Sequence, residues 1–441
     1  MNNIIIISIT LFLGLMNFTW HNSVQGQDLP RRAYFEASIS YPSTNAPGAV
    51  IQKVHPDSPL GMAGVKAKDV IIEVNNRKII TQEDMSYTFS SIRSGELTTV
   101  KIIRGNKMFE VSVELPPYSL EEHKGIETIY GHIVNDSGMR QRTIITKPHK
   151  KNKLPAIMLL QGLSCSSIEK YSEKSNNWIR LINDLVEKSG MVVMRVEKPG
   201  VGDSEGDCGE VDFETELSGY AGAIEKLKSL PYVDSSKVII YGNSMGSMLA
   251  PYFAKKFNLA GIISDGTFFK SWYEHMLEIE RRILEIEGKT QSEIYTLINT
   301  VYIPLYYEML IKKRTFEEIL KEYPTYKAYH RQGLNHMYGR SMKYYHQLQD
   351  FNIGEAWSEL TIPVRIRWGT NDWIMSEFDN DMIKKVILNS GNSNIEVFKY
   401  DGLDHWATIH PDYKSSFNFE EGEWEEKISQ QIIDWAWEIV E

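Results

Sequence analysis

A serine lies between two glycines at the point where an apolar run gives way to a helix-compatible stretch. Residues 238–241 are β-branched or aromatic, Gly242 and Gly246 flank Ser244, and the helix-compatible stretch begins at Met245. A strand, a sharp turn and a helix in this order expose a serine hydroxyl at the edge of a sheet, and the glycines permit strained backbone and close helix packing. The pattern indicates a nucleophile at Ser244. The alternative is a serine that only caps the helix.

Short apolar strands alternate with amphipathic helices from residue 126 onward. The expected strands are 126–133, 141–146, 155–160, 191–196, 237–241, 261–264, 363–368 and 394–400. Amphipathic helices are expected at 178–188, 213–230 and 427–439. This alternation predicts an α/β domain with a mostly parallel sheet flanked by helices. In open sheets of this kind the ligand site lies at the carboxyl ends of the strands, which is where Ser244 falls.

Three glycine-containing motifs follow three consecutive strands of this pattern. Residues 160–166 follow the third strand, residues 198–204 the fourth and residues 242–246 the fifth. In these motifs and their order, residues 118–441 resemble an exported bacterial α/β-hydrolase of the serine esterase type. The resemblance implies the α/β-hydrolase fold and hydrolysis of carboxylic esters through an acyl-enzyme at Ser244.

The resemblance also implies a Ser-Asp-His triad, because in this fold the acid and the base follow the serine along the chain. Asp372 comes after the penultimate expected strand, and His405 comes after the last one. We therefore expect Asp372 to be the acid and His405 the base. Asp265, after the sixth strand, is an alternative acid. His410 is expected to lie on the surface.

The same fold would supply two backbone N–H donors for an oxyanion, those of Leu163 and Met245. Glutamine at position 161 replaces the more frequent histidine, but the donors are backbone groups and keep their role. The only two cysteines, Cys165 and Cys208, lie in loops after neighbouring strands, which are spaced about 5 Å apart. A disulfide between them is therefore expected, and it would hold the oxyanion loop in place.

Residues 31–116 are expected to form a separate small α+β domain. Strands are predicted at 48–54, 69–75, 98–104 and 108–115, and a helix at 81–92. A Ser-Pro, an Ala-Gly-Val and a Lys-Asp-Val-Ile motif between residues 58 and 71 resemble a PDZ domain of the bacterial protease-associated kind. That resemblance implies capture of a peptide end by strand addition. Residues 33–37, where the carboxylate-binding loop would fall, have no glycine and include Glu36, so a docking role for the domain is the alternative.

The amino terminus has the features of a targeting segment. Residues 4–16 are apolar, fewer than the roughly 20 residues that a membrane span needs, and small residues near position 26 fit a cleavage site. We expect a signal peptide over residues 1–26, an exported protein in the periplasm or outside the cell, and no stable membrane span after cleavage; an uncleaved anchor is the alternative. The net charge of −10 argues against a nucleic-acid partner.

A long insertion separates the sixth and seventh expected strands. We predict a helical cap over about residues 267–350, because Trp272, Met276, Ile279, Ile283 and Ile286 recur at helical spacing. Three histidines of this region, at positions 330, 336 and 346, are not spaced as neighbouring ligands on one helix face, so we expect no metal. No cofactor is expected either.

Three functions remain open from the sequence. The first is a serine carboxylesterase acting on a small-molecule ester, which the resemblance favours. The second is a serine peptidase on the same fold, because the first domain resembles a peptide-binding module that could take a peptide or protein segment. The third is a binding protein that has kept the fold without catalysis. Ester and amide substrates separate the first two, because esters need less protonation of the leaving group.

Overall fold

The computed structural model describes residues 29–41, 47–170, 176–330 and 332–441. The expected signal peptide therefore lies outside the described residues. No helix within the described ranges combines the length and the apolar character needed to cross a bilayer.

The amino-terminal domain is a small antiparallel sheet with two helices. Its strands are β1 (Ala37–Ser40), β2 (Ala49–Val54), β3 (Val70–Val74), β4 (Arg77–Lys78), β5 (Leu97–Arg104) and β6 (Lys107–Glu114), and its helices are α1 (Pro59–Met62) and α2 (Gln82–Ser91). The strands lie in the order β1-β2-β3-β5-β6, with β4 paired to β3. Thr81 starts α2 with a capping box to Asp84. A core of its own, which includes Ile51, Ile71 and Val100, holds this domain together.

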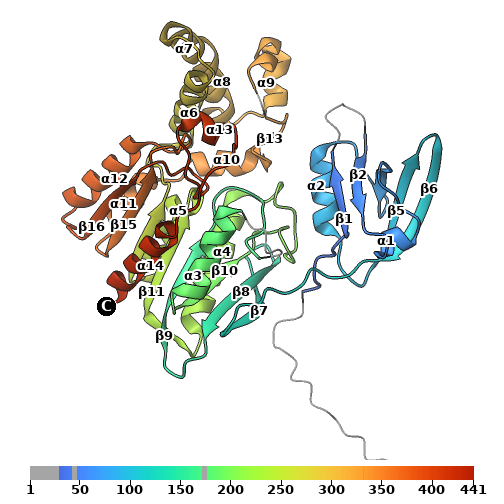
Figure 1. The fold of residues 1–441 in the computed structure, drawn as a ribbon. Coiled ribbons are helices and arrows are strands. Elements are labelled where there is room, and N and C mark those ends of the chain that lie inside the picture. Colours follow the sequence, from blue (N-terminus) through green and yellow to red (C-terminus); the bar gives the residue numbers. More distant parts are fainter. Residues whose placement is uncertain (1–28, 42–46, 171–175, 331) are drawn as a thin grey trace, which may run out of the picture.

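The larger domain is built on an eight-stranded sheet (Figure 1). Its strands are β7 (Ile126–Val134), β8 (Arg140–Pro148), β9 (Leu154–Leu160), β10 (Val192–Val196), β11 (Val233–Asn243), β12 (Gly261–Asp265), β15 (Val364–Gly369) and β16 (Ile395–Tyr400). They lie in the order β16-β15-β12-β11-β9-β10-β8-β7. The six strands from β16 to β10 run parallel, and β7 and β8 are antiparallel additions at one edge. Each strand expected from the sequence is present.

Helices cover both faces of this sheet. The helices α3 (Asn177–Lys188) and α14 (Lys427–Val440) pack on the face that Ile239 and Tyr241 of β11 enter. On the opposite face, which Ile240 enters, lie α4 (Phe213–Ser229), α5 (Met245–Phe257) and α12 (Glu377–Asn389). Successive side chains of a strand point to opposite faces, so these apolar strands are buried on both sides.

An insertion between β12 and β15 forms a helical cap at one end of the larger domain (Figure 1). It contains α6 (Trp272–Ile286), α7 (Gln291–Leu297), α8 (Ile303–Tyr306), α9 (Phe316–Glu322) and α10 (Met342–Gln349), two π-helical turns (Ile298–Tyr302 and Tyr307–Ile311), a 3-10 turn (Pro324–Ala328) and a hairpin of β13 (His336–Met337) and β14 (Arg340–Ser341). Two short helices, α11 (Ile353–Ser358) and α13 (Tyr413–Phe417), complete the fold. Four of the five apolar residues of α6 that recur at helical spacing, Trp272, Met276, Ile279 and Ile283, are buried. The fifth, Ile286, is partly exposed at the end of the helix.

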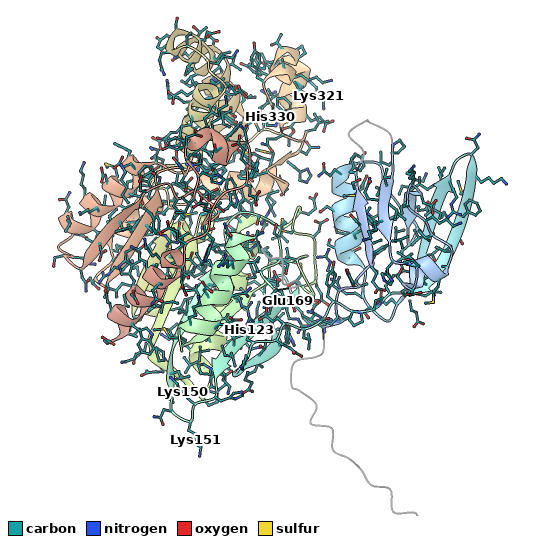
Figure 2. All side chains as sticks on the ribbon, in the orientation of Figure 1. His123, Lys150, Lys151, Glu169, Lys321 and His330 are labelled. Atoms are coloured by element: carbon teal, nitrogen blue, oxygen red, sulfur yellow. A yellow bond between two sulfur atoms is a disulfide. The ribbon has the colours of Figure 1, made fainter. Side chains whose placement is uncertain are left out.

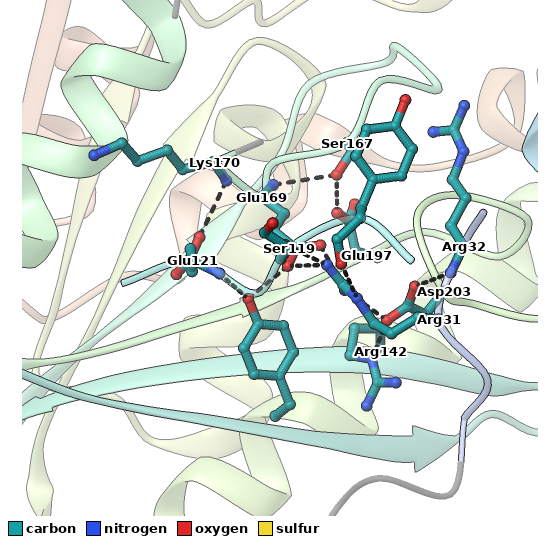
Figure 3. A network of polar contacts seen from close by, with 12 residues as sticks. Arg31, Arg32, Ser119, Glu121, Arg142, Ser167, Glu169, Lys170, Glu197 and Asp203 are labelled. Carbon is teal, nitrogen blue, oxygen red and sulfur yellow. Dashed lines mark hydrogen bonds and ion pairs between the residues drawn. The ribbon is translucent and has the colours of Figure 1, made fainter. Parts of the chain in front are cut away.

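The two domains are joined by buried ion pairs (Figure 3). Nη1 of Arg31 donates to Glu169 at 2.9 Å and to Asp203 at 2.8 Å, and Nη2 donates to the second oxygen of Glu169 at 2.8 Å. Arg142 shares the carboxylate of Asp203. Figure 2 places Glu169 on the side of the larger domain that faces the smaller one. Because Glu169 follows β9 and Asp203 follows β10, Arg31 fastens the smaller domain to two loops at the carboxyl edge of the sheet.

Candidate active site

Ser244 occupies a strained corner between β11 and α5. Its backbone has φ 55° and ψ −122°, a conformation that residues other than glycine rarely adopt. A hydrogen bond from its N–H to the carbonyl oxygen of Asp265, at 2.9 Å, ties this corner to the neighbouring strand β12. The side chain makes no capping hydrogen bond to α5, so the hydroxyl is not used to satisfy the helix.

The glycines on either side of Ser244 are needed for close packing. A Cβ atom at Gly242 would lie 2.5 Å from the carbonyl oxygen of Gly246, and one at Gly246 would lie 2.1 Å from the carbonyl oxygen of Leu160. Both obstacles are backbone atoms, which cannot rotate away. The turn therefore keeps its shape only with glycine at both positions.

Asp372 and His405 come together in front of this corner. They follow β15 and β16, and Oδ2 of Asp372 lies 2.7 Å from Nδ1 of His405. The other carboxylate oxygen accepts hydrogen bonds from the N–H groups of Ile374 and Met375, both at 2.9 Å. Gly266 leaves room for the pair, because a Cβ there would lie 3.2 Å from Asp372 and 3.3 Å from His405.

Burial and the pair's own charges act in opposite directions on both groups. Burial by itself would raise the pKa of Asp372, but the charge of His405 and the hydrogen bond from it hold that pKa below its usual value. Burial would lower the pKa of His405, whereas the charge and hydrogen bond of Asp372 raise it above the usual value. The Asp372 carboxylate therefore makes the His405 imidazole a stronger base.

Two further expectations at this edge of the sheet have different outcomes. Asp265, the alternative acid, binds Arg367 through both oxygens, at 3.0 and 2.5 Å, and accepts a hydrogen bond from Tyr241, so it is engaged away from the histidine. The expectation that His410 lies on the surface is wrong. Its side chain is buried with Nε2 3.3 Å from Asp404, because the loop folds back and the N–H of His410 reaches the carbonyl oxygen of Gly402.

Ser244 and His405 line a cavity of about 350 Å³ together with Leu163 and Met245. Aromatic side chains make up much of the remaining wall: Trp178, Phe268, Trp272, Tyr338, Trp373 and Trp406. Phe268, Trp272 and Tyr338 belong to the cap region, so the insertion forms one side of the cavity. The cavity suits an uncharged, largely apolar substrate group.

The loop after β9 lies directly against Ser244. A Cβ at Gly162 would be 3.0 Å from the Cβ of Ser244. The next residue, Leu163, therefore has its N–H in the part of the loop that lies against the serine. The N–H of Met245 is the first of α5 and has no partner within the helix. The expected disulfide is confirmed: Cys165 and Cys208 are bonded, with their Cα atoms 5.9 Å apart, and they link this loop to the one after β10.

One group of side chains with metal-ligand spacing occurs in the described part of the chain, and no sequence motif indicates it. His275, Glu278 and Asp379 bring their ligand atoms within 4.8 Å of one another. The ammonium of Lys270 lies 2.7 Å from Glu278 and 3.2 Å from Asp379, so the acidic members already have a cationic partner. His330, His336 and His346 are not members of this group.

Comparison with known proteins agrees with this architecture. The model of the alpha/beta hydrolase fold family matches residues 155–410, which is more than half of the chain. The chain belongs to this family. A model of the PDZ domain matches residues 27–115, so the hydrolase domain is preceded by a PDZ domain, as the sequence indicated. The expected fold class is confirmed in both parts.

Relatives and solved structures resemble this chain over different lengths. Esterase EstD of Thermotoga maritima is 22% identical over 334 residues, which cover 74% of this chain and 73% of that protein. Serine endoprotease DegS of Haemophilus influenzae is 28% identical over 87 residues, which cover 20% of this chain and 26% of that protein. Among solved structures, an esterase of Pyrococcus furiosus aligns with 74% of this chain and 97% of its own, with 12% identity and a TM-score of 0.44.

Proposed function

We propose that the protein is a serine carboxylesterase that works through an acyl-enzyme. The observation that carries the proposal is the cavity in which the strained Ser244 and the buried Asp372–His405 pair meet. Three loops, which follow the strands β11, β15 and β16, supply these residues. A relative named as an esterase, EstD, adds support for ester hydrolysis.

The reaction begins with Ser244. Its Oγ attacks the ester carbonyl carbon while Nε2 of His405 takes the hydroxyl proton, and Asp372 at Nδ1 stabilises the imidazolium that forms. The N–H groups of Leu163 and Met245 bind the negative oxygen of the tetrahedral intermediate. When the intermediate collapses, the alcohol leaves with the proton from His405. Water then attacks the acyl-enzyme, again with His405 as base, and the acid is released.

Active-site labelling tests the mechanism directly. A fluorophosphonate probe should label the wild-type protein once, and mass spectrometry should place the label on Ser244. The Ser244→Ala variant should lose both the label and the hydrolysis of p-nitrophenyl acyl esters. A label that persists in this variant, or ester hydrolysis that persists without Ser244, would overturn the proposal.

A serine peptidase is the second candidate, and the PDZ domain is the observation in its favour, because such a domain can bind a peptide end. A stretch of 87 residues of this chain also resembles a protein named as a serine endoprotease, DegS of Haemophilus influenzae. The loop expected to bind a peptide carboxylate offers little for that role. The N–H of Ala33 donates to the carbonyl oxygen of Ile92 at 3.0 Å, and that of Tyr34 to Pro116 at 2.7 Å. Turnover of aminoacyl anilides at a rate near that of p-nitrophenyl esters would favour the peptidase.

We further propose that the protein is exported to the periplasm or beyond the cell. The apolar residues 4–16 and the small residues near position 26 support a cleaved signal peptide. The Cys165–Cys208 bond fits an oxidising compartment. Fractionation of the native host and sequencing of the mature amino terminus test this proposal, and a cytosolic protein that begins at Met1 would contradict it.

A further inference from the structure

A buried lysine contacts the peptide group that carries one of the proposed oxyanion donors. Nζ of Lys198, a residue that is 1% exposed, donates a hydrogen bond to the carbonyl oxygen of Gly162. This carbonyl and the N–H of Leu163 belong to one peptide unit, so they point in opposite directions from the same rigid plane. The lysine therefore binds this peptide unit on the side opposite to the N–H of Leu163, a residue that lines the cavity together with Ser244.

A second cation holds the next peptide unit of the loop. Nη1 of Arg340, which comes from β14 of the cap and is fully buried, donates to the carbonyl oxygen of Leu163 at 3.3 Å. One carboxylate serves both cations: Glu216 of α4 lies 3.5 Å from Nζ of Lys198 and pairs with Arg340. Two successive carbonyl groups of the loop, those of Gly162 and Leu163, are thus each held by a buried cation. The cations come from the loop after β10 and from the cap, and a carboxylate of α4 binds both.

A cationic donor on a carbonyl oxygen has a defined effect on the N–H of the same peptide unit. It draws electron density toward the oxygen, which makes the N–H more positive and strengthens the hydrogen bond that this N–H donates. Hydrogen bonds with a charged partner are about twice as strong as neutral ones, so the effect is larger than in an ordinary turn. The gain is greatest when the N–H meets a full negative charge, which occurs only in the tetrahedral intermediate.

We propose that Lys198 is a positioning residue that orients and polarises the Gly162–Leu163 peptide unit, so that the N–H of Leu163 stabilises the oxyanion more strongly than the ester substrate. The inference rests on the esterase function proposed above. Lys198 does not touch the substrate, since it acts through the peptide group. This role explains why a cation occupies the buried position, since packing alone does not require a charge there.

The ionisation of Lys198 gives the proposal a second observable. Burial lowers the pKa of this ammonium to about 8, although Glu216 and Glu197 partly oppose the shift and Arg340 adds to it. Burial also raises the pKa of the adjacent Glu197 to about 8. The Lys198 charge is present below this pH and is lost above it, so the rate should fall on the alkaline side.

The test is the Lys198→Met variant, which keeps the length of the side chain and removes the charge. We expect kcat for p-nitrophenyl esters to fall about tenfold with KM within twofold, because one oxyanion donor is weakened and not removed. A trifluoromethyl ketone, which forms a negatively charged adduct with the serine, should lose affinity by the same factor as kcat/KM. The alkaline fall in kcat/KM near pH 8 should disappear from the variant.

Lys228→Met is the matched control, because Nζ of Lys228 also donates to a backbone carbonyl, that of Phe257 at 2.6 Å, outside the active site. It should leave kcat and the pH profile unchanged. Equal kcat in Lys198→Met and wild type, a fall confined to KM, or an unchanged alkaline limb would overturn the inference. In the wild-type protein, ketone affinity should likewise fall between pH 7 and 9 as Lys198 loses its charge, and this measurement does not depend on the folding of a variant. The esterase proposal would still stand if Ser244→Ala abolished labelling.

Discussion

The carboxylate of Asp372 uses its two oxygens for different purposes. Oδ1 is held by the N–H groups of Ile374 and Met375, which fix the plane of the carboxylate. Oδ2 faces Nδ1 of His405 and so fixes the tautomer of the imidazole, which leaves Nε2 free to act on the Ser244 hydroxyl. The backbone thus orients the Asp372 carboxylate and the carboxylate orients the His405 imidazole, as the proposed roles of acid and base require.

The Asp372→Asn variant separates these contributions. We expect kcat to fall by a factor of about 10⁴, because the amide stabilises the wrong tautomer of His405. The acidic limb of kcat/KM should also move to lower pH: neutral His405 is the active form, Asp372 raises its pKa, and removal of that charge lowers the pKa again. Steady-state kinetics between pH 4 and 9 would measure both effects.

Asp265→Asn is the comparison for that experiment, because Asp265 is the other acid at this sheet edge and it binds Arg367. It should lower the melting temperature, since a buried guanidinium loses its partner, while the folded fraction keeps most of its kcat. If Asp265→Asn caused the larger loss of kcat, the assignment of Asp372 as the acid would be wrong.

At the scale of residues, the sequence predicted the site residues in loops that directly follow strands. It did not predict the buried side chains that hold the loop with Leu163 from the side away from the cavity. Ser244, Asp372 and His405 lie in loops after strands, where motif and chain order are informative. Arg340 reaches the oxyanion loop from 177 positions away along the chain, a proximity that exists only after the cap has folded. Glu216 lies on a helix whose charge pattern gives no sign that this carboxylate is buried.

At the scale of elements, the contact between α5 and β9 determines whether the serine turn can form. Gly246→Ala would place a methyl group 2.1 Å from the carbonyl oxygen of Leu160, so α5 would have to move away from the sheet. We expect a loss of about 1–3 kcal/mol in the free energy of unfolding, as for other overpacked sites, together with a loss of esterase activity. Urea denaturation and p-nitrophenyl ester turnover would measure the two.

Gly222→Ala in α4 is the matched control for that substitution. A Cβ at Gly222 meets its nearest neighbour, Ile133, at an ordinary 3.8 Å. Alanine is the better helix former, so this variant should gain about 0.5–1 kcal/mol of stability and keep its activity. If both variants lost activity equally, close packing at Gly246 would not be the cause.

The main strands and several of the long helices could be predicted because each of them has a local signal in the sequence. Alternating strands and amphipathic helices are encoded in hydrophobic periodicity, and α6 shows its buried stripe in the sequence. The position of the loop that contains His410 could not be read in this way. Its burial depends on the pairing of Asp404 with His410 and on backbone contacts to Gly402, which no periodicity records.

At the scale of the whole molecule, the PDZ domain is connected to the same loops that form the active site. The contacts of Arg31 with Glu169 and Asp203 (Figure 3) are made in the loops after β9 and β10, and the same loops carry Leu163 and Cys208. Arg31 also donates to the carbonyl oxygens of Tyr118 and Ser119 in the connecting segment. The domain junction therefore contacts both loops that the Cys165–Cys208 bond links, so the PDZ domain is attached directly to the loop that carries Leu163.

The Arg31→Gln variant tests this connection. Two buried carboxylates would lose a cation, and we expect a loss of about 3 kcal/mol in the free energy of unfolding, at the low end for breaking a buried pair because Arg31 is partly exposed. A fall in kcat for a small ester should accompany it, because Arg31 holds the loop that carries Leu163. The effect would be indirect, since none of the described PDZ residues lines the cavity beside Ser244. Calorimetry and steady-state kinetics would measure the two effects.

The Arg104→Gln variant is the control, because Arg104 makes an equivalent double contact with Asp69 inside the PDZ domain, at 2.7 Å for each bond. It should destabilise the PDZ domain alone and leave the hydrolysis of small esters unchanged. If Arg104→Gln lowered kcat as much as Arg31→Gln, general loosening of the PDZ domain would explain the effect. If neither variant changed kcat, the PDZ domain would be attached to the hydrolase domain without supporting its active site.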